Sequence, residues 1–152
     1  MFWLDRRYDL AIEQGRLVVE IAPTNFTGHF AIGLVYREAR RFDDAIAALR
    51  NADDLAGGAP MLWGWLGLAL AESGDIAGAQ CLLARLRALP HDVYVPPSSI
   101  AQIHLGLGEV DAFFESMSRA IDERDHMVMP MKTYPSWIVS AMTRGTWVFC
   151  GR

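Results

Sequence analysis

Four histidines are the first side chains in this 152-residue sequence that could bind a metal ion or transfer a proton. Two ligands on one helix must stand three or four residues apart to reach the same ion. No two of the histidines have this spacing; they are His29, His91, His104 and His126. We therefore predict no metal site and no cofactor, and we expect the histidines to fill space or lie on the surface.

Two pairs of acidic residues could suggest acid–base catalysis. They are Asp43–Asp44 and Asp53–Asp54. Adjacent residues on a helix point about 100° apart, so neither pair would aim both carboxylates at one substrate. Nucleophile-elbow, phosphate-loop and zinc-protease motifs are absent from the sequence. We predict that the protein is not an enzyme and has no catalytic residue.

The two cysteines, Cys81 and Cys150, are far apart and lack the spacing of a disulfide frame or a zinc site. This pattern favours reduced thiols in a cytoplasmic protein, each packed as a small buried apolar residue. The first ten residues have too short an apolar run for a secretory signal. We predict a cytoplasmic location.

The charge pattern argues against nucleic acid and membrane partners. The net charge is −4, and the basic residues form no tract that would neutralise phosphates. The longest uncharged run, Leu55–Ala71, opens with a Gly-Gly-Ala-Pro turn that leaves only Pro60–Ala71 for a helix. A spanning helix needs roughly 20 apolar residues, so we predict no direct nucleic-acid contact and no membrane insertion.

An internal repeat organises the elements that carry these residues. Small and bulky residues recur 34 positions apart: Gly33 and Gly67, Ala45 and Ala79, Leu49 and Leu83. Such a recurrence predicts repeated helix pairs, with small residues where paired helices approach closely. Seven helices are expected, near residues 8–22, 26–39, 42–55, 60–73, 76–89, 97–107 and 110–124.

The period and the run WGWLGLAL at residues 63–70 resemble the tetratricopeptide repeat. The predicted fold class is all-α: a right-handed α-solenoid of antiparallel helix pairs, with about three full repeats and a half repeat. The repeat domain is assigned to residues 1–126, with units at 8–23, 26–59, 60–93 and 94–126. Residues 127–152 are a divergent C-terminal segment and a possible cap of the domain.

A narrower resemblance rests on YVPPSSIAQIHLGLGEVD, Tyr94 to Asp111, and on RAIDERD, Arg119 to Asp125. These residues are similar to the C-terminal tetratricopeptide regions of bacterial winged-helix transcriptional regulators, class III adenylate cyclases and kinases. The resemblance implies a docking module of a larger bacterial signalling or transcription-regulatory protein.

The concave face of such a solenoid is its usual binding surface. On the first helix of each pair, the side turned away from the packing glycine is expected to line a partner-binding groove. The predicted groove residues are Phe30, Leu34, Arg37, Met61, Leu68, Gln102 and Leu105.

The preferred hypothesis is that a protein or peptide partner binds in this groove. The alternative is a small-molecule sensor, in which Phe30, Met61 and Trp63 enclose a ligand that controls an attached effector. Self-association through the unpaired helix Tyr8–Ile21 is a third possibility. The groove could also be filled by residues 127–152 of the chain itself.

Overall fold

The computed structural model describes residues 7–125, and it contains the seven expected helices. Their ends differ from the predicted ends by no more than two residues. The helices are α1 (Tyr8–Ile21), α2 (Phe26–Glu38), α3 (Phe42–Ala56), α4 (Pro60–Ser73), α5 (Ile76–Arg87), α6 (Pro97–Leu107) and α7 (Val110–Asp122).

Local sequence signals set these helix ends. The Asn25 side chain accepts a hydrogen bond from the Thr27 N–H at the start of α2, and the Asp75 side chain accepts one from the Gly78 N–H at the start of α5. Three helices end on a glycine in the left-handed conformation, which residues with a Cβ rarely adopt: Gly57, Gly74 and Gly108. The turns are therefore encoded in the sequence beside each helix.

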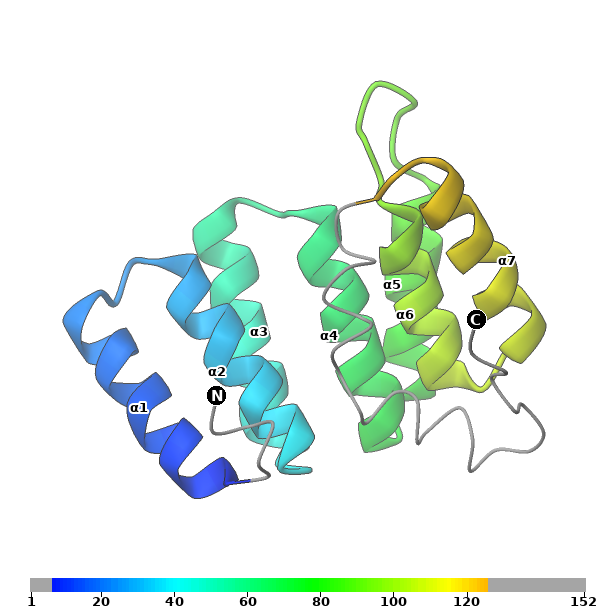
Figure 1. Ribbon diagram of the computed structural model, residues 1–152. Coiled ribbons are helices and arrows are strands. Elements are labelled where there is room, and N and C mark those ends of the chain that lie inside the picture. The colour runs from blue at the N-terminus through cyan, green and yellow to red at the C-terminus, as the bar shows by residue number, and fades with distance from the viewer. Residues whose placement is uncertain (1–6, 126–152) are drawn as a thin grey trace.

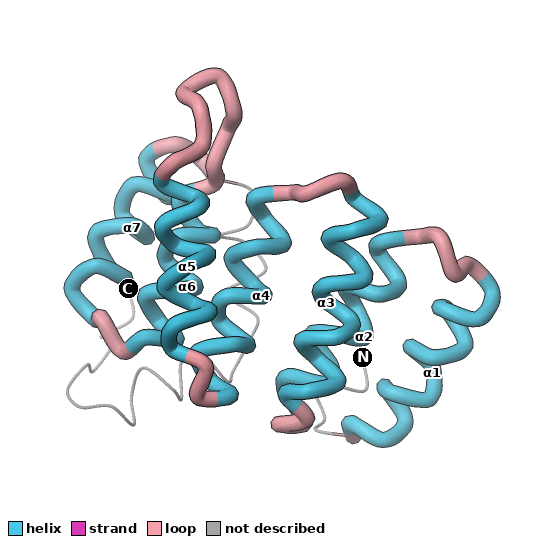
Figure 2. Tube along the Cα trace, turned by 180° about the vertical axis from the view of Figure 1, so that it is seen from behind, coloured by secondary structure: helices cyan, strands magenta, loops and turns pink. Residues whose placement is uncertain are grey.

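The helices form antiparallel pairs that follow one another across the molecule, from α1 at one end to α7 at the other (Figure 1). Seen from behind, α3 lies in front of α2, and α5 lies in front of α6 (Figure 2). The all-α helical-repeat solenoid predicted from the sequence is confirmed. Within residues 7–125, no helix is long and apolar enough to cross a membrane.

The junction between α4 and α6 is the closest contact between successive pairs. A Cβ added at Gly64 would lie 2.6 Å from the Ser99 Cα atom, and one added at Gly67 would lie 2.6 Å from Ile103 Cγ1. On the other side, a Cβ at Gly106 would lie 2.7 Å from the Ala71 Cβ. Only glycine fits these three positions. At each of them, the backbone of one helix therefore packs directly against residues of the other.

The junction between α2 and α4 is built differently, because large side chains fill it. The Phe30 and Trp65 rings meet edge to face with centroids 6.2 Å apart. Leu34, on α2, is buried in the same apolar cluster as Leu66 and Leu68 of α4. A smaller cluster around Ile12, Ile32 and Tyr36 joins α1 to α2 and α3. The apolar core thus runs the length of the array in two parts.

Gly64→Ala tests the α4–α6 contact. We expect it to lower the free energy of unfolding by about 1–3 kcal/mol, because the new methyl group meets backbone that has no room to move. Gly28→Ala is the control: its Cβ would lie 3.2 Å from the half-exposed Val18 side chain, which can shift. Urea unfolding followed by circular dichroism measures both. Equal effects of the two substitutions would contradict the close-packed junction.

Candidate functional site

The seven predicted groove residues lie on three first helices and form one connected region. Phe30, Leu34, Met61, Leu68 and Leu105 belong to a single apolar cluster or pack against it. The Arg37 guanidinium lies over the Trp65 ring, which belongs to this cluster. The Gln102 side chain lies against Gly64, the residue before Trp65. The prediction that α2, α4 and α6 bring these side chains together agrees with the structure, whereas their role in binding stays a prediction.

Their exposure differs from the expectation of an open groove. Only Phe30 and Met61 are half-buried, and the other five are buried: Leu34, Arg37, Leu68, Gln102 and Leu105. Leu68 and Gln102 are about 1% exposed, because they lie between α4 and α6 and pack against Gly106 and Gly64. The predicted open position of these two side chains is thus corrected. The accessible part of the region is its edge at Phe30 and Met61.

Arg37 ties α2 to α4 through Glu72 and Trp65, and it also pairs with Glu38 on its own helix. Its guanidinium donates to both carboxylate oxygens of Glu72, at 2.7 and 3.2 Å, and to Glu38 at 2.7 Å. The same group lies 5.8 Å from the centroid of the Trp65 ring. An arginine side chain can make the forked bond and the ring contact together, and a lysine cannot. Arg37 is 5% exposed, so it acts here as a structural link.

Two buried polar atoms on α6 lack a hydrogen-bond partner. Within the described part of the chain, neither Ser98 Oγ nor Gln102 Oε1 has one. The two residues stand four apart and therefore share one side of the helix. A buried polar atom without a partner costs about 1–3 kcal/mol, so each such atom in a native protein calls for an explanation.

A polar contact that joins the buried His104 of α6 to α5 and to the turn before α7 was missed from the sequence, where His104 was expected only to fill space. His104 Nε2 lies 3.1 Å from an Arg87 nitrogen, and its Nδ1 contacts Glu109. Arginine can only donate, so Nε2 accepts and Nδ1 carries the proton that bonds to Glu109. Arg87 lies 17 residues before His104, on the preceding helix, so no local spacing indicates the contact between them.

Asp53 also has a partner that the sequence analysis missed. It accepts hydrogen bonds from the Trp63 indole N–H at 2.9 Å and from the Ala59 N–H at 3.0 Å. The Arg85 guanidinium covers the Trp63 ring at 4.1 Å. Trp63 thus contacts both α3 and α5 through its ring. The small-molecule hypothesis, which placed Trp63 with Phe30 and Met61 around one ligand, stays a prediction.

The Glu-Arg-Asp ending of the described region has a structural role. Asp125 is buried, and its carboxylate accepts a hydrogen bond of 3.1 Å from the Ser98 N–H at the start of α6. Burial and the charges of Asp125 and Glu123 raise the pKa of Tyr94 above its usual value. The two ends of the YVPP…ERD pattern are therefore in contact through space.

The expected burial of the cysteines was wrong at Cys81. Cys81 is exposed on α5 and has a free thiol, whereas it was expected to be buried. Cys150 lies outside the described residues, as does the possible cap at residues 127–152. In the part of the chain that the structure describes, no three His, Cys, Asp or Glu side chains come together in a metal-binding arrangement.

Stacked antiparallel helix pairs with a 34-residue period define this region as an α-solenoid. The family model described as "Tetratricopeptide repeat" matches residues 30–92, which span α3 to α5 and most of α2. Residues 30–92 are therefore similar to tetratricopeptide repeats, a class of helical repeat that mediates protein–protein interaction. No curated protein matches the sequence.

Arg37→Met tests the link between α2 and α4. We expect it to lower the free energy of unfolding by about 1–3 kcal/mol, because Glu72 loses a two-bond partner. Arg37→Lys should restore only part of this loss. Arg50→Met is the matched control, since Arg50 is exposed on α3 and forms no ion pair within residues 7–125. If Arg37→Met and Arg50→Met unfold at the same urea concentration, the link contributes nothing.

Proposed function

We propose that this domain is a docking module of a bacterial signalling or transcription-regulatory protein, and that it holds a partner segment against α2, α4 and α6. The domain class supports protein binding in general. The partner, the bacterial context and the cytoplasmic location are parts of the proposal.

The observation that carries the proposal is the pair of unsatisfied atoms, Ser98 Oγ and Gln102 Oε1. A partner segment in an extended conformation offers backbone N–H and C=O groups, which could pair with an amide oxygen and a hydroxyl one helical turn apart. The half-buried Phe30 and Met61 give the partner an apolar edge to contact first. Gln102 is about 1% exposed and lies against Gly64, so binding requires α4 and α6 to move apart locally at this point.

In this proposal Arg37 stabilises the α2–α4 junction and does not bind a carboxylate of the partner. Three of its five N–H donors are used by Glu72 and Glu38, and the side chain is 5% exposed, so it is poorly placed to hold the C-terminal carboxylate of a peptide. The partner segment is therefore expected to bind through internal residues.

Gln102→Met tests the proposal through two opposite effects. Methionine has nearly the same length and no unsatisfied oxygen, so we expect the free energy of unfolding to rise by about 1–2 kcal/mol. Partner capture should fall, because the atom that pairs with the partner is gone. Stability is measured by urea unfolding, and capture by quantitative mass spectrometry of proteins retained from source-cell extract.

The control is Gln80→Met, the same change at an exposed position of α5. It should leave both stability and capture unchanged. A Gln102→Met variant that is stabilised but retains every partner of the unmodified chain would show that the unsatisfied oxygen has no part in binding.

A further inference from the structure

The outer side of α1 combines an apolar stripe with a row of acidic residues. Leu17, Val18 and Ile21 are 45%, 50% and 84% exposed, although each is a large apolar side chain. Next to them, Asp9, Glu13 and Glu20 line a groove of about 350 Å³ between α1 and the start of α3. We call these six residues the α1 outer face.

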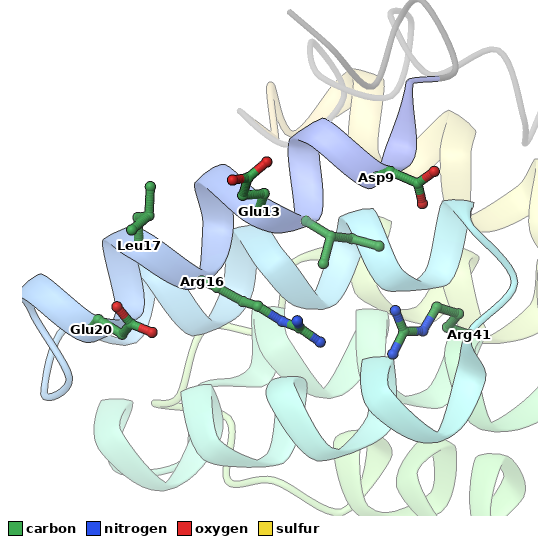
Figure 3. A pocket seen from close by; sticks show the side chains of 7 residues that line it. Asp9, Glu13, Arg16, Leu17, Glu20 and Arg41 are labelled. Carbon is green, nitrogen blue, oxygen red and sulfur yellow. The ribbon is translucent and has the colours of Figure 1, made fainter.

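The charges in this groove are not balanced. Figure 3 shows the three acidic residues spread along α1, with Arg16 and Arg41 reaching toward one another. Arg41 is already paired with Asp44 at 2.6 Å, and Arg16 donates to the Tyr36 hydroxyl at 3.2 Å. Within residues 7–125, the carboxylates of Asp9, Glu13 and Glu20 form no ion pair. The groove therefore offers open negative charge beside exposed apolar surface.

The α1 outer face has the pattern of one side of a helix–helix contact. Leu17 and Ile21 are four residues apart and share one side of α1, and Glu13 lies one turn before Leu17. In paired helices, an apolar stripe makes the contact, and charges along its edge select a partner of opposite sign. The opposite side of α1 is already used, because Ile12 packs with Ile32 and Tyr36.

We propose that the α1 outer face binds an amphipathic helix of a partner protein, with apolar residues against Leu17, Val18 and Ile21 and with Lys or Arg along the edge that meets Asp9, Glu13 and Glu20. The α1 helix has 14 residues, which corresponds to about 20 Å and four turns of such a partner. This surface is separate from the face proposed above to hold a partner segment.

A second copy of the chain fits this face less well. An antiparallel pair of α1 helices related by a two-fold axis would bring the acidic edge of one copy against the acidic edge of the other. Each acidic edge carries three carboxylates and the Arg16 guanidinium, and Arg41 is already paired with Asp44, so the net contact is repulsive. Residues 127–152 also match poorly: they contain Lys132, Arg144 and Arg152, whose separations of 12 and 8 residues differ from those of the acidic row.

The test uses two designed 18-residue peptides that form the same amphipathic helix, one with lysines along one edge and one with glutamates at those positions. Binding to the full chain is measured by fluorescence anisotropy. We expect the lysine peptide to bind and the glutamate peptide not to bind. The double variant Glu13→Lys/Glu20→Lys should bind the lysine peptide at least about tenfold more weakly and should gain binding to the glutamate peptide.

The matched control is Glu115→Lys/Asp122→Lys, since these two residues are exposed on α7 and have the same seven-residue separation. It should bind the lysine peptide like the unmodified chain. Gln102→Met should also leave this binding unchanged, so a failure here and a failure of the partner face on α2, α4 and α6 can be told apart. Circular dichroism verifies that each variant is folded.

Three results would overturn the proposal. The first is no binding of the lysine peptide, and the second is binding that Glu13→Lys/Glu20→Lys leaves unchanged. The third is that this face is occupied by the chain itself. A concentration-dependent mass that Ile21→Ser abolishes would show that a second copy binds there. Binding of a synthetic peptide of residues 127–152, with the same dependence on Glu13 and Glu20, would show that the C-terminal segment binds there.

Discussion

The close approach of α4 and α6 is the constraint on which the rest of this structure depends. Gly64, Gly67 and Gly106 remove the side chains that would hold the two helices apart. With the helices this close, Leu68 and Gln102 are enclosed between them, and the groove is closed at its centre. Ser98 and Gln102 then keep buried polar atoms that nothing in the described chain satisfies. We connect these atoms with binding because packing alone gives no reason to keep them.

The α2–α4 junction shows what happens where this constraint is absent. Phe30, Trp65 and the Arg37–Glu72 pair hold the two helices together through their side chains. A junction made of ring contacts and a forked ion pair can adjust by rotating side chains, whereas a glycine junction adjusts only when the helix backbones shift, which costs more. The array therefore has a rigid half and a half in which small movements cost less. The half-buried Phe30 and Met61 lie at the α2–α4 junction, where small movements cost less.

Most of the fold was predictable from the sequence because its signals are local. The 34-residue period, the Asn25 and Asp75 caps and the glycines after the helices mark each pair and each turn. The burial of Leu68 and Gln102 was not predictable, because it depends on the distance between helices of different pairs. Gly33 and Gly67 are equivalent in the repeat, yet a Cβ at Gly33 would meet Leu49 of the same pair, and one at Gly67 would meet Ile103 of the next. The period alone does not separate these two uses of glycine.

The central claim is that the shared face of α2, α4 and α6 contacts a partner protein at its accessible edge. Photo-crosslinking in source cells tests it most directly, with p-benzoylphenylalanine at position 61 and, as the control, at the exposed position 80 of α5. The account predicts a defined crosslinked product from position 61 that position 80 does not give. The same products from both positions, or none from position 61, would contradict it.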